Sequence, residues 1–446
     1  MNIIFLLMLL SLLVSQSLMD LMSFVVIVAS LWGWKKQLLI NGRKFQFYRI
    51  GLEKLWLAWI LVFVVGLFLA PFSSAELAAH PNSPWLFRLS SLGELKWIIN
   101  FYFFVWFFAW VLPWEVNTST KSVPSENIFQ YVWGGLLIFS AYALFALAFD
   151  FDLAKQQPLS DPGRVGGLFD DPMTFAHVYG QFFVLIFFIT LNRLLEKIPT
   201  STFKNILVSD GLLFLTTLFS GLAVLLSMTR GVWIGVFIGL LVPTFLYRKK
   251  LGMIFLGVTT SLFFLIFFSW PKFHERVVLA FSSSSYDGER IWLWMANWKM
   301  FLDHPFFGIG YGIYKWRLRE YFDLMGAPAE QFESHAHNQY LHFLAGTGLL
   351  GLLCFLIFIG FNLWTTWKLI VITKTSSLKG MALGLLGSQI CFLVAALTES
   401  NFERAKVRWT YLVFAALGIA ALKINSHSAT SRWLRADSEK VDPEQI

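Results

Sequence analysis

Hydrophobic residues gather in long runs that short polar segments separate along most of the chain. A run of about 20 apolar residues can cross the hydrocarbon core of a bilayer as a helix. The pattern therefore predicts an all-α, polytopic integral membrane protein with about 12 transmembrane helices. We expect these helices at residues 2–16, 18–34, 54–71, 97–114, 127–149, 173–191, 206–228, 231–247, 251–270, 339–367, 380–398 and 408–424. The first two runs are short, and a tilted hairpin is an alternative for them.

Lysine and arginine residues concentrate in loops that an even number of helices places on one side of the membrane. Short cytoplasmic loops carry an excess of these residues, so this side is expected to be the cytoplasm, together with both termini. The basic residues are Lys35, Lys36, Arg43, Lys44, Arg49, Arg193, Lys197, Lys204, Arg248, Lys249, Lys250, Lys368, Lys374, Lys379, Arg432 and Arg435. The opposite, outer side then carries residues 72–96, 150–172, 227–231, 271–338 and 399–407.

The longest outer segment, residues 271–338, has a helical pattern of its own. Apolar residues recur at helical spacing over 289–302, which predicts an amphipathic helix that Pro305 brings to an end. A turn is expected at 307–312, and a second helix at 313–324. The outer loop is therefore expected to be mostly helical and to lie on the membrane surface.

Composition supports the membrane assignment and excludes other classes. Hydrophobic residues make up 57% of the chain and charged residues only 14%, which one soluble core could not accommodate. The net charge of +8 follows from the basic loops. No basic stripe with interleaved aromatic residues accompanies it, so no nucleic-acid partner is expected. The two cysteines, Cys354 and Cys391, lie in apolar runs and predict no disulfide.

Two arginines are candidates for binding an anion. Arg230 lies between two apolar runs, where a charge is costly and is usually paired or lines a pathway. A guanidinium group can bind phosphate with two parallel N–H donors; snorkelling, or pairing with an aspartate of residues 150–171, is the alternative. Arg290 opens the amphipathic helix, whose N-terminus favours anions. Its alternative is a solvated side chain paired with Asp287 or Glu289.

A histidine cluster precedes the run at 339–367. A histidine titrates near neutral pH, so His337 could remove a proton from a sugar hydroxyl. His335 and His337 could instead bind a metal with His304 or His274 as a third ligand. No H-E-x-x-H motif and no available cysteine supports that alternative, so no metal is expected. A structural histidine at the membrane interface is a further alternative.

The next glycine-rich stretch resembles a nucleotide-binding motif. Gly346–Gly351 matches G-x-G-x-x-G, but it follows no strand and lies within an apolar run. We expect these glycines to serve close helix packing. His342, about one turn inside the same run, is expected to be a packing or hydrogen-bonding residue.

Four motifs together resemble the O-antigen ligase / O-antigen polymerase superfamily of bacterial envelope glycosyltransferases, over roughly residues 150–400. The motifs are Arg164–Phe169 with Asp171 and Pro172; Thr229–Gly231; Arg290 with Trp294, leading to Asp303–Gly310; and His337 and Asn338 with Tyr340, Leu341 and Gly348–Gly351. All lie on the expected outer side.

The resemblance implies an inverting, metal-independent transfer of a glycan, without a cofactor, at the periplasmic face of the bacterial inner membrane. The donor would be an undecaprenyl-diphosphate-linked glycan, and an O-antigen ligase would use lipid A-core as acceptor. By the same resemblance, Arg230 and Arg290 would bind the donor diphosphate and His337 would be the general base. Weaker candidates for substrate binding are Arg164, His335, Asn338 and Glu399. The implied division of the chain is N-terminal helices at 1–149, a catalytic region at 150–425 that includes the loop 271–338, and a cytoplasmic tail at 426–446.

Three other functions stay open. An O-antigen polymerase would use a second lipid-linked repeat as acceptor, and a protein O-oligosaccharyltransferase would use a protein. Relatives of the latter kind usually carry a longer C-terminal region. A transporter or flippase would predict charged residues deep within several helices, whereas the apolar runs here are nearly free of charge at their centres.

Overall fold

The structure is a computed structural model. It describes residues 2–41, 50–80, 82–111, 114–117, 120–124, 126–169, 171–195, 203–278, 287–328, 332, 335–373 and 376–438. Residues 42–49 of the first basic loop, Lys197, Lys374 and Asp170 lie outside these ranges. So do residues 279–286 of the outer loop and 439–446 of the tail.

The described chain is almost entirely helical, which confirms the all-α prediction. The elements are α1 (Asn2–Val14), α2 (Gln16–Asn41), α3 (Glu53–Leu69), α4 (Ser74–Ala79), α5 (Pro84–Ser90), η1 (Ser91–Leu95), α6 (Lys96–Trp106), the π-helix η2 (Phe107–Val111), β1 (Trp114–Asn117), β2 (Thr120–Pro124), α7 (Glu126–Phe149), β3 (Phe151–Asp152), β4 (Gln157–Pro158), α8 (Pro172–Leu195), α9 (Phe203–Leu226), α10 (Arg230–Tyr247), α11 (Lys249–Ser269), α12 (Pro271–Val278), α13 (Asp287–Asp303), η4 (Tyr311–Ile313), α14 (Tyr314–Leu324), α15 (Gln339–Ile372), α16 (Ser376–Ala395) and α17 (Ala405–Ser438). The antiparallel pairs β1–β2 and β3–β4 were not predicted.

Each of the twelve expected apolar runs coincides with a helix over most of its described length, although the run at 97–114 ends at Trp114, the first residue of β1. In the described part of the chain, eight helical segments are long and apolar enough to cross a membrane. The protein is therefore a multi-pass membrane protein. Because the remaining apolar helices are shorter, the number of twelve crossings stays a prediction.

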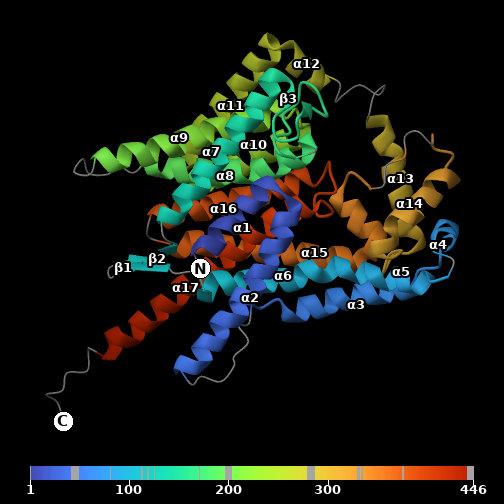
Figure 1. Ribbon diagram of the computed structural model, residues 1–446, viewed down its shortest axis with the longest axis horizontal. Coiled ribbons are helices and arrows are strands. Elements are labelled where there is room, and N and C mark those ends of the chain that lie inside the picture. Colours follow the sequence, from blue (N-terminus) through green and yellow to red (C-terminus); the bar gives the residue numbers. More distant parts are fainter. Residues whose placement is uncertain are drawn as a thin grey trace.

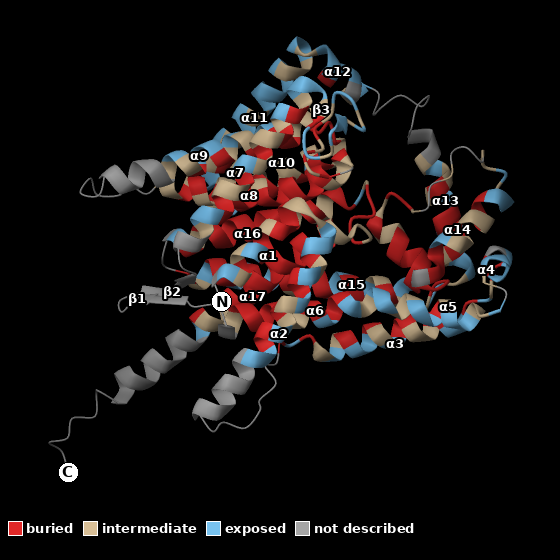
Figure 2. Ribbon diagram, viewed as in Figure 1, coloured by how far each residue is buried: buried red, intermediate tan, exposed pale blue. Residues whose placement is uncertain are grey.

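The buried core lies among the C-terminal helices. Helix α16 packs between α8 and α10, and α17 packs against α6, α15 and α16. The buried residues follow these contacts (Figures 1 and 2). Helix α11 differs, because only 6% of the residues in its apolar stretch are buried, so most of its surface is left to face lipid.

The two helices predicted within the outer loop are confirmed as α13 and α14. They lie beside α4 and α5 at one end of the molecule (Figure 1). A small core joins them, in which Leu293 and Met300 of α13 pack with Tyr314, Leu318 and Phe322. The predicted stop at Pro305 is also observed, whereas the preceding short helix α12 was not predicted.

Helix α15 is kinked at Gly348, which has φ 66° and ψ −170°. The turn after α13 lies in the kink and replaces lost helical hydrogen bonds: Leu349 N–H donates to the Pro305 carbonyl (2.8 Å), and Ile309 N–H donates to the Ala345 carbonyl (3.0 Å). A Cβ on Gly348 would lie 2.3 Å from the Phe306 carbonyl carbon. These glycines were expected to serve close packing between helices, whereas Gly348 breaks the helix and packs against the turn at 305–310. The kink attaches the outer loop to the start of α15.

Candidate functional site

Two histidines and one glutamate meet at the start of α15. Glu399 Oε1 lies 3.1 Å from His335 Nε2, and Glu399 Oε2 lies 3.1 Å from His337 Nδ1. His337 is 5% exposed and Glu399 is 2% exposed. The backbone fixes this pairing, because Gln339 N–H donates to the Ala396 carbonyl (2.9 Å). The turn after α16 is thereby held against the start of α15.

Asn338 completes this junction. Its side-chain oxygen accepts hydrogen bonds from the N–H groups of Tyr340 and Leu341, both at 3.0 Å, and so caps α15. Its amide nitrogen donates to the Leu397 carbonyl (3.1 Å). Both polar atoms of Asn338 are thus used in structure, which leaves the predicted substrate-binding role untested.

Glu399 is held in its ionised form. Burial by itself would raise the pKa of this carboxyl, but hydrogen bonds from His335 and His337 and the nearby Arg404 charge hold the pKa well below its ordinary value of 4.5. An ionised carboxylate only accepts hydrogen bonds. The facing atoms, His337 Nδ1 and His335 Nε2, must therefore carry hydrogens, and neutral His337 keeps its lone pair on Nε2.

The backbone at His337 is unusual. Its φ is 46°, in the left-handed region that costs a residue with a side chain about 1–2 kcal/mol. Trp294 of α13 holds the same segment, because its Nε1–H donates to the Ala336 carbonyl (3.0 Å). Strained backbone that its surroundings hold in place is characteristic of functional sites.

Trp294 also brings Arg290 toward the histidines, since both residues are on α13 and one helical turn apart. The Nε of Arg290 is buried and has no hydrogen-bond partner among the described residues. A buried guanidinium N–H without a partner is costly, and an anionic ligand would satisfy it.

Arg230 approaches the same junction from α10, whose first residue it is. The next residue, Gly231, lies so close to Thr398 that a Cβ there would be 2.0 Å from Thr398 Oγ1. Because Thr398 immediately precedes Glu399, the first turn of α10 lies beside the glutamate that holds the histidines. Helices α10 and α13 therefore contact the two segments that carry Glu399 and the histidines, and Arg230 and Arg290 lie within one turn of these contacts.

Arg164 supports the Arg230 turn. Its Nε donates to the Ser227 carbonyl (3.0 Å), and its guanidinium donates to Thr229 Oγ1 (3.3 Å) and to Asp161 (2.6 Å). Arg164 thus pairs with Asp161, an aspartate of the 150–171 segment. This arginine holds the backbone that precedes Arg230.

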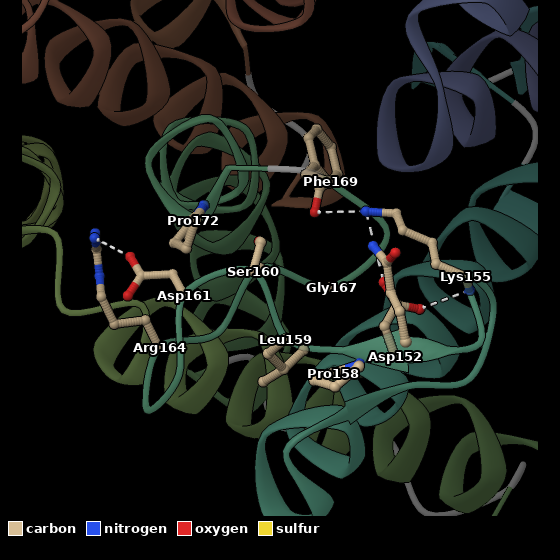
Figure 3. Close-up of a pocket in the computed structure, with 12 residues that line it drawn as sticks. Asp152, Lys155, Pro158, Leu159, Ser160, Asp161, Arg164, Gly167, Phe169 and Pro172 are labelled. Atoms are coloured by element: carbon tan, nitrogen blue, oxygen red, sulfur yellow. Dashed lines mark hydrogen bonds and ion pairs between the residues drawn. The ribbon is translucent and has the colours of Figure 1, made fainter.

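The loop that carries Arg164 encloses a small hollow, shown in Figure 3 with Asp152 and Lys155 at one side and Asp161 and Arg164 at the other. The hollow has a volume of only about 10 Å³. That is about the space of one water molecule, which excludes a sugar or diphosphate there.

Sequence motifs did not identify several residues of this region. Arg404 contacts Asp171, donates to Thr174 Oγ1 (2.9 Å) and places its Nε 3.6 Å from Glu399 Oε1. Glu403 lies 3.3 Å from His342, which is buried against the ring of Tyr314 as its packing role predicted. The sequence feature that could have identified Glu403 and Arg404 is the charged segment 399–407, which lies between two apolar runs.

The cluster has a possible ligand set for a metal. The ligating atoms of His335, His337 and Glu399 lie within 4.8 Å of one another. The third member is Glu399, not His304 or His274. Two imidazoles and a carboxylate suit Zn²⁺, but Arg404 next to Glu399 opposes a cation there.

Comparisons with known proteins agree with the motifs. Residues 215–356 match a family model described as O-antigen ligase, and this segment contains Arg230, Arg290 and His337. A curated relative, the teichuronic acid biosynthesis protein TuaE of Bacillus subtilis (strain 168), is 26% identical over 199 residues. That alignment covers 43% of this chain and 39% of the relative. Residues 215–356 are thus similar to an O-antigen ligase family, and both comparisons agree with the resemblance to the O-antigen ligase / O-antigen polymerase superfamily, a group of glycosyltransferase-related membrane enzymes.

Proposed function

We propose that this protein transfers a glycan from an undecaprenyl-diphosphate carrier to an acceptor hydroxyl at the periplasmic face of the inner membrane. The observation that carries the proposal is the hydrogen bond between Glu399 and His337 Nδ1. It leaves the Nε2 lone pair of a neutral imidazole available as a general base. The buried Nε of Arg290, which has no partner among the described residues, also supports the proposal, because the donor diphosphate would satisfy it.

In the proposed reaction, His337 Nε2 takes the proton of the acceptor hydroxyl as the hydroxyl oxygen attacks the anomeric carbon of the donor sugar. The new carbon–oxygen bond forms on the face opposite the bond to phosphate, so that the configuration inverts. The carbon–oxygen bond to the diphosphate breaks, and undecaprenyl diphosphate leaves with the bonding electrons. Arg230 and Arg290 stabilise the charge that develops on it.

Glu399 acts through the histidines in this scheme. Its carboxylate fixes the tautomer of His337 and stabilises the imidazolium that forms, as the carboxylate of a hydrolase triad does. His335 shares the same carboxylate, which gives it an orienting role. Arg404 stabilises the charged form of Glu399 in turn.

We propose lipid A-core as the acceptor, which makes the protein an O-antigen ligase. The description of the matching family supports this acceptor. The second candidate is a polymerase that uses another lipid-linked repeat. The relative's name favours it, because that name refers to the biosynthesis of teichuronic acid and not to ligation.

The acceptor is tested by deleting the gene and separating the lipopolysaccharide on a gel. If the protein is a ligase, the lipid A-core of the deletion strain should carry no O-antigen. If it is a polymerase, the lipid A-core should carry a single repeat. An unchanged ladder would contradict both. Transport without glycosyl transfer by the purified protein would support the flippase alternative instead.

A further inference from the structure

A cavity of about 460 Å³ lies next to the histidine cluster, and among its lining residues only Arg404 has a role in the mechanism proposed above. It opens between the starts of α2 and α6, the segment before α8, and the start of α17. Its volume is within the range of about 300–1,000 Å³ that is typical of small-molecule sites. Arg230, Arg290, His335 and His337 do not line it.

The cavity wall is charged, with an excess of cations. Four basic residues and three carboxylates line it: Lys96, Arg404, Lys406, Arg408, Glu94, Asp171 and Glu403. One Glu403 oxygen is buried, and burial raises the pKa of this carboxyl to about 7. At neutral pH the wall is therefore net positive, which favours an anionic ligand.

One arginine on this wall has an unused donor. Arg408 is 3% exposed, donates to the Phe402 carbonyl (3.0 Å) and lies 3.6 Å from Glu94, but its Nε has no hydrogen-bond partner within the described ranges. The Nε of Arg404 is directed instead at Glu399 Oε1, at 3.6 Å. Lys406 Nζ lies 4.2 Å from the centre of the Phe169 ring, which provides an apolar face beside the charges.

The cavity and the catalytic histidines share a wall. Arg404 lines the cavity and lies 3.6 Å from Glu399, which is hydrogen-bonded to His337. Helices α10 and α13, which carry Arg230 and Arg290, instead contact Thr398 and Ala336, the residues next to Glu399 and His337. The cavity and the two arginines thus lie against different parts of this junction.

We propose that this cavity binds an anionic sugar of the acceptor, one that bears a carboxylate or a phosphate. The acceptor chain then passes from the cavity around Glu399 to the Nε2 edge of His337, and the donor diphosphate lies on the side of α10 and α13. This inference rests on the proposed glycosyl transfer. It adds the chemical class of the acceptor and the place where it binds.

Binding is tested in the His337→Ala protein, where turnover does not consume the ligands. The probes are glucuronate, glucose 6-phosphate and uncharged glucose, and the readout is the ligand-induced rise in Tm. We expect one or both charged probes to stabilise the protein and glucose not to do so. Glucuronate alone would identify a carboxylate sugar, and glucose 6-phosphate alone a phosphorylated one.

The matched variants are Lys96→Ala/Lys406→Ala in the cavity and Lys272→Ala, an exposed lysine of α12 outside it. The double variant should weaken binding of the charged probe about tenfold or more, and Lys272→Ala should not. In the active protein, the same double variant should raise the acceptor KM and leave the donor KM unchanged.

Equal stabilisation by all three probes, stabilisation by none, or unchanged binding in the double variant would overturn the proposal. These results are distinct from failure of the proposed function. If the cavity proposal alone is wrong, transfer still depends on His337. If transfer does not depend on His337, the mechanism fails whatever the cavity binds.

Discussion

At the scale of single residues, the site is a set of polar contacts around one buried carboxylate. Glu399 accepts hydrogen bonds from two histidines, with Arg404 at 3.6 Å. The loss of one partner from a buried charged network leaves the others unsatisfied. Conservative substitutions should therefore have large effects here.

Glu399→Gln should lower the transfer rate by up to about 10⁴-fold, the cost of the corresponding Asp→Asn change in a hydrolase triad. Glu399→Asp keeps the charge and should retain more activity than Glu399→Gln. Steady-state rates of the purified proteins check this order. Equal rates for the two variants would contradict an electrostatic role for the carboxylate.

The same substitution should change the stability of the protein in acid. The pKa of Glu399 lies below its ordinary value in the folded protein, so the unfolded state binds more protons as the pH falls through 4.5. The contribution of Glu399 to the free energy of unfolding is thus present above pH 4.5 and is lost below it. The Tm difference between wild type and Glu399→Gln should narrow on acidification, and a constant difference would contradict this assignment.

Arg230→Lys and Arg290→Lys should each lower kcat by about 10²–10³-fold, because lysine cannot reproduce the two parallel donors that stabilise the leaving diphosphate. Arg319→Lys is the matched control, since Arg319 is 39% exposed and pairs with Asp323 on α14. It should keep the wild-type rate. A wild-type kcat in both Arg230→Lys and Arg290→Lys would contradict the proposal that these arginines stabilise the leaving diphosphate.

At the scale of elements, the kink in α15 connects the outer loop to the site. The turn at 305–310 fits against α15 because Gly348 has a positive φ and no side chain. This turn ends α13, which carries Arg290 and Trp294. The position of the donor-side arginine therefore depends on the kink.

Gly348→Ala should destabilise the protein by at least about 1–2 kcal/mol, the cost of a left-handed backbone with a side chain, with a clash at Phe306 in addition. Gly360→Ala in the same helix is the control, because nothing lies within 4 Å of a Cβ there. It should be neutral or stabilise by about 0.5–1 kcal/mol. Thermal unfolding measures both, and similar Tm values would contradict the account of the kink.

Helices were predictable from the sequence, whereas the contacts between them were not. Apolar runs and Pro305 located the helices and the end of α13, since these signals are local. The contacts of Glu399 with His335 and His337 join residues 64 and 62 positions apart. They depend on the register at which Gln339 meets Ala396, which no local pattern records. The start of α15 is different, because asparagine before an apolar run is a local sequence signal for a helix N-terminus, and Asn338 caps α15 in this way.

At the scale of the whole molecule, a membrane-embedded core supports a helical outer region at one end (Figure 1). The histidines precede α15 and Glu399 begins the 399–404 link, while α8 contacts Arg404, α10 contacts Thr398 and α13 contacts Ala336. The substrates in the proposed reaction are a lipid-linked donor and an acceptor, and the proposed acceptor site is the cavity beside Arg404.

Removal of metal should leave the reaction unchanged, because two arginines supply the positive charge that a divalent ion would otherwise provide. The rate of the purified enzyme after EDTA treatment, with and without added Zn²⁺ or Mg²⁺, measures this. If EDTA abolished transfer and either ion restored it, His335, His337 and Glu399 would have to be reinterpreted as metal ligands.

The most direct test of the account is the transfer rate of purified His337→Ala with an undecaprenyl-diphosphate-linked glycan. His274→Ala, at an exposed histidine of α12, is the control and should keep the wild-type rate. We predict that His337→Ala reaches the membrane in normal amounts and loses about 10²–10⁴-fold in rate, the contribution of a general base. Wild-type turnover by a folded His337→Ala protein would contradict the central claim.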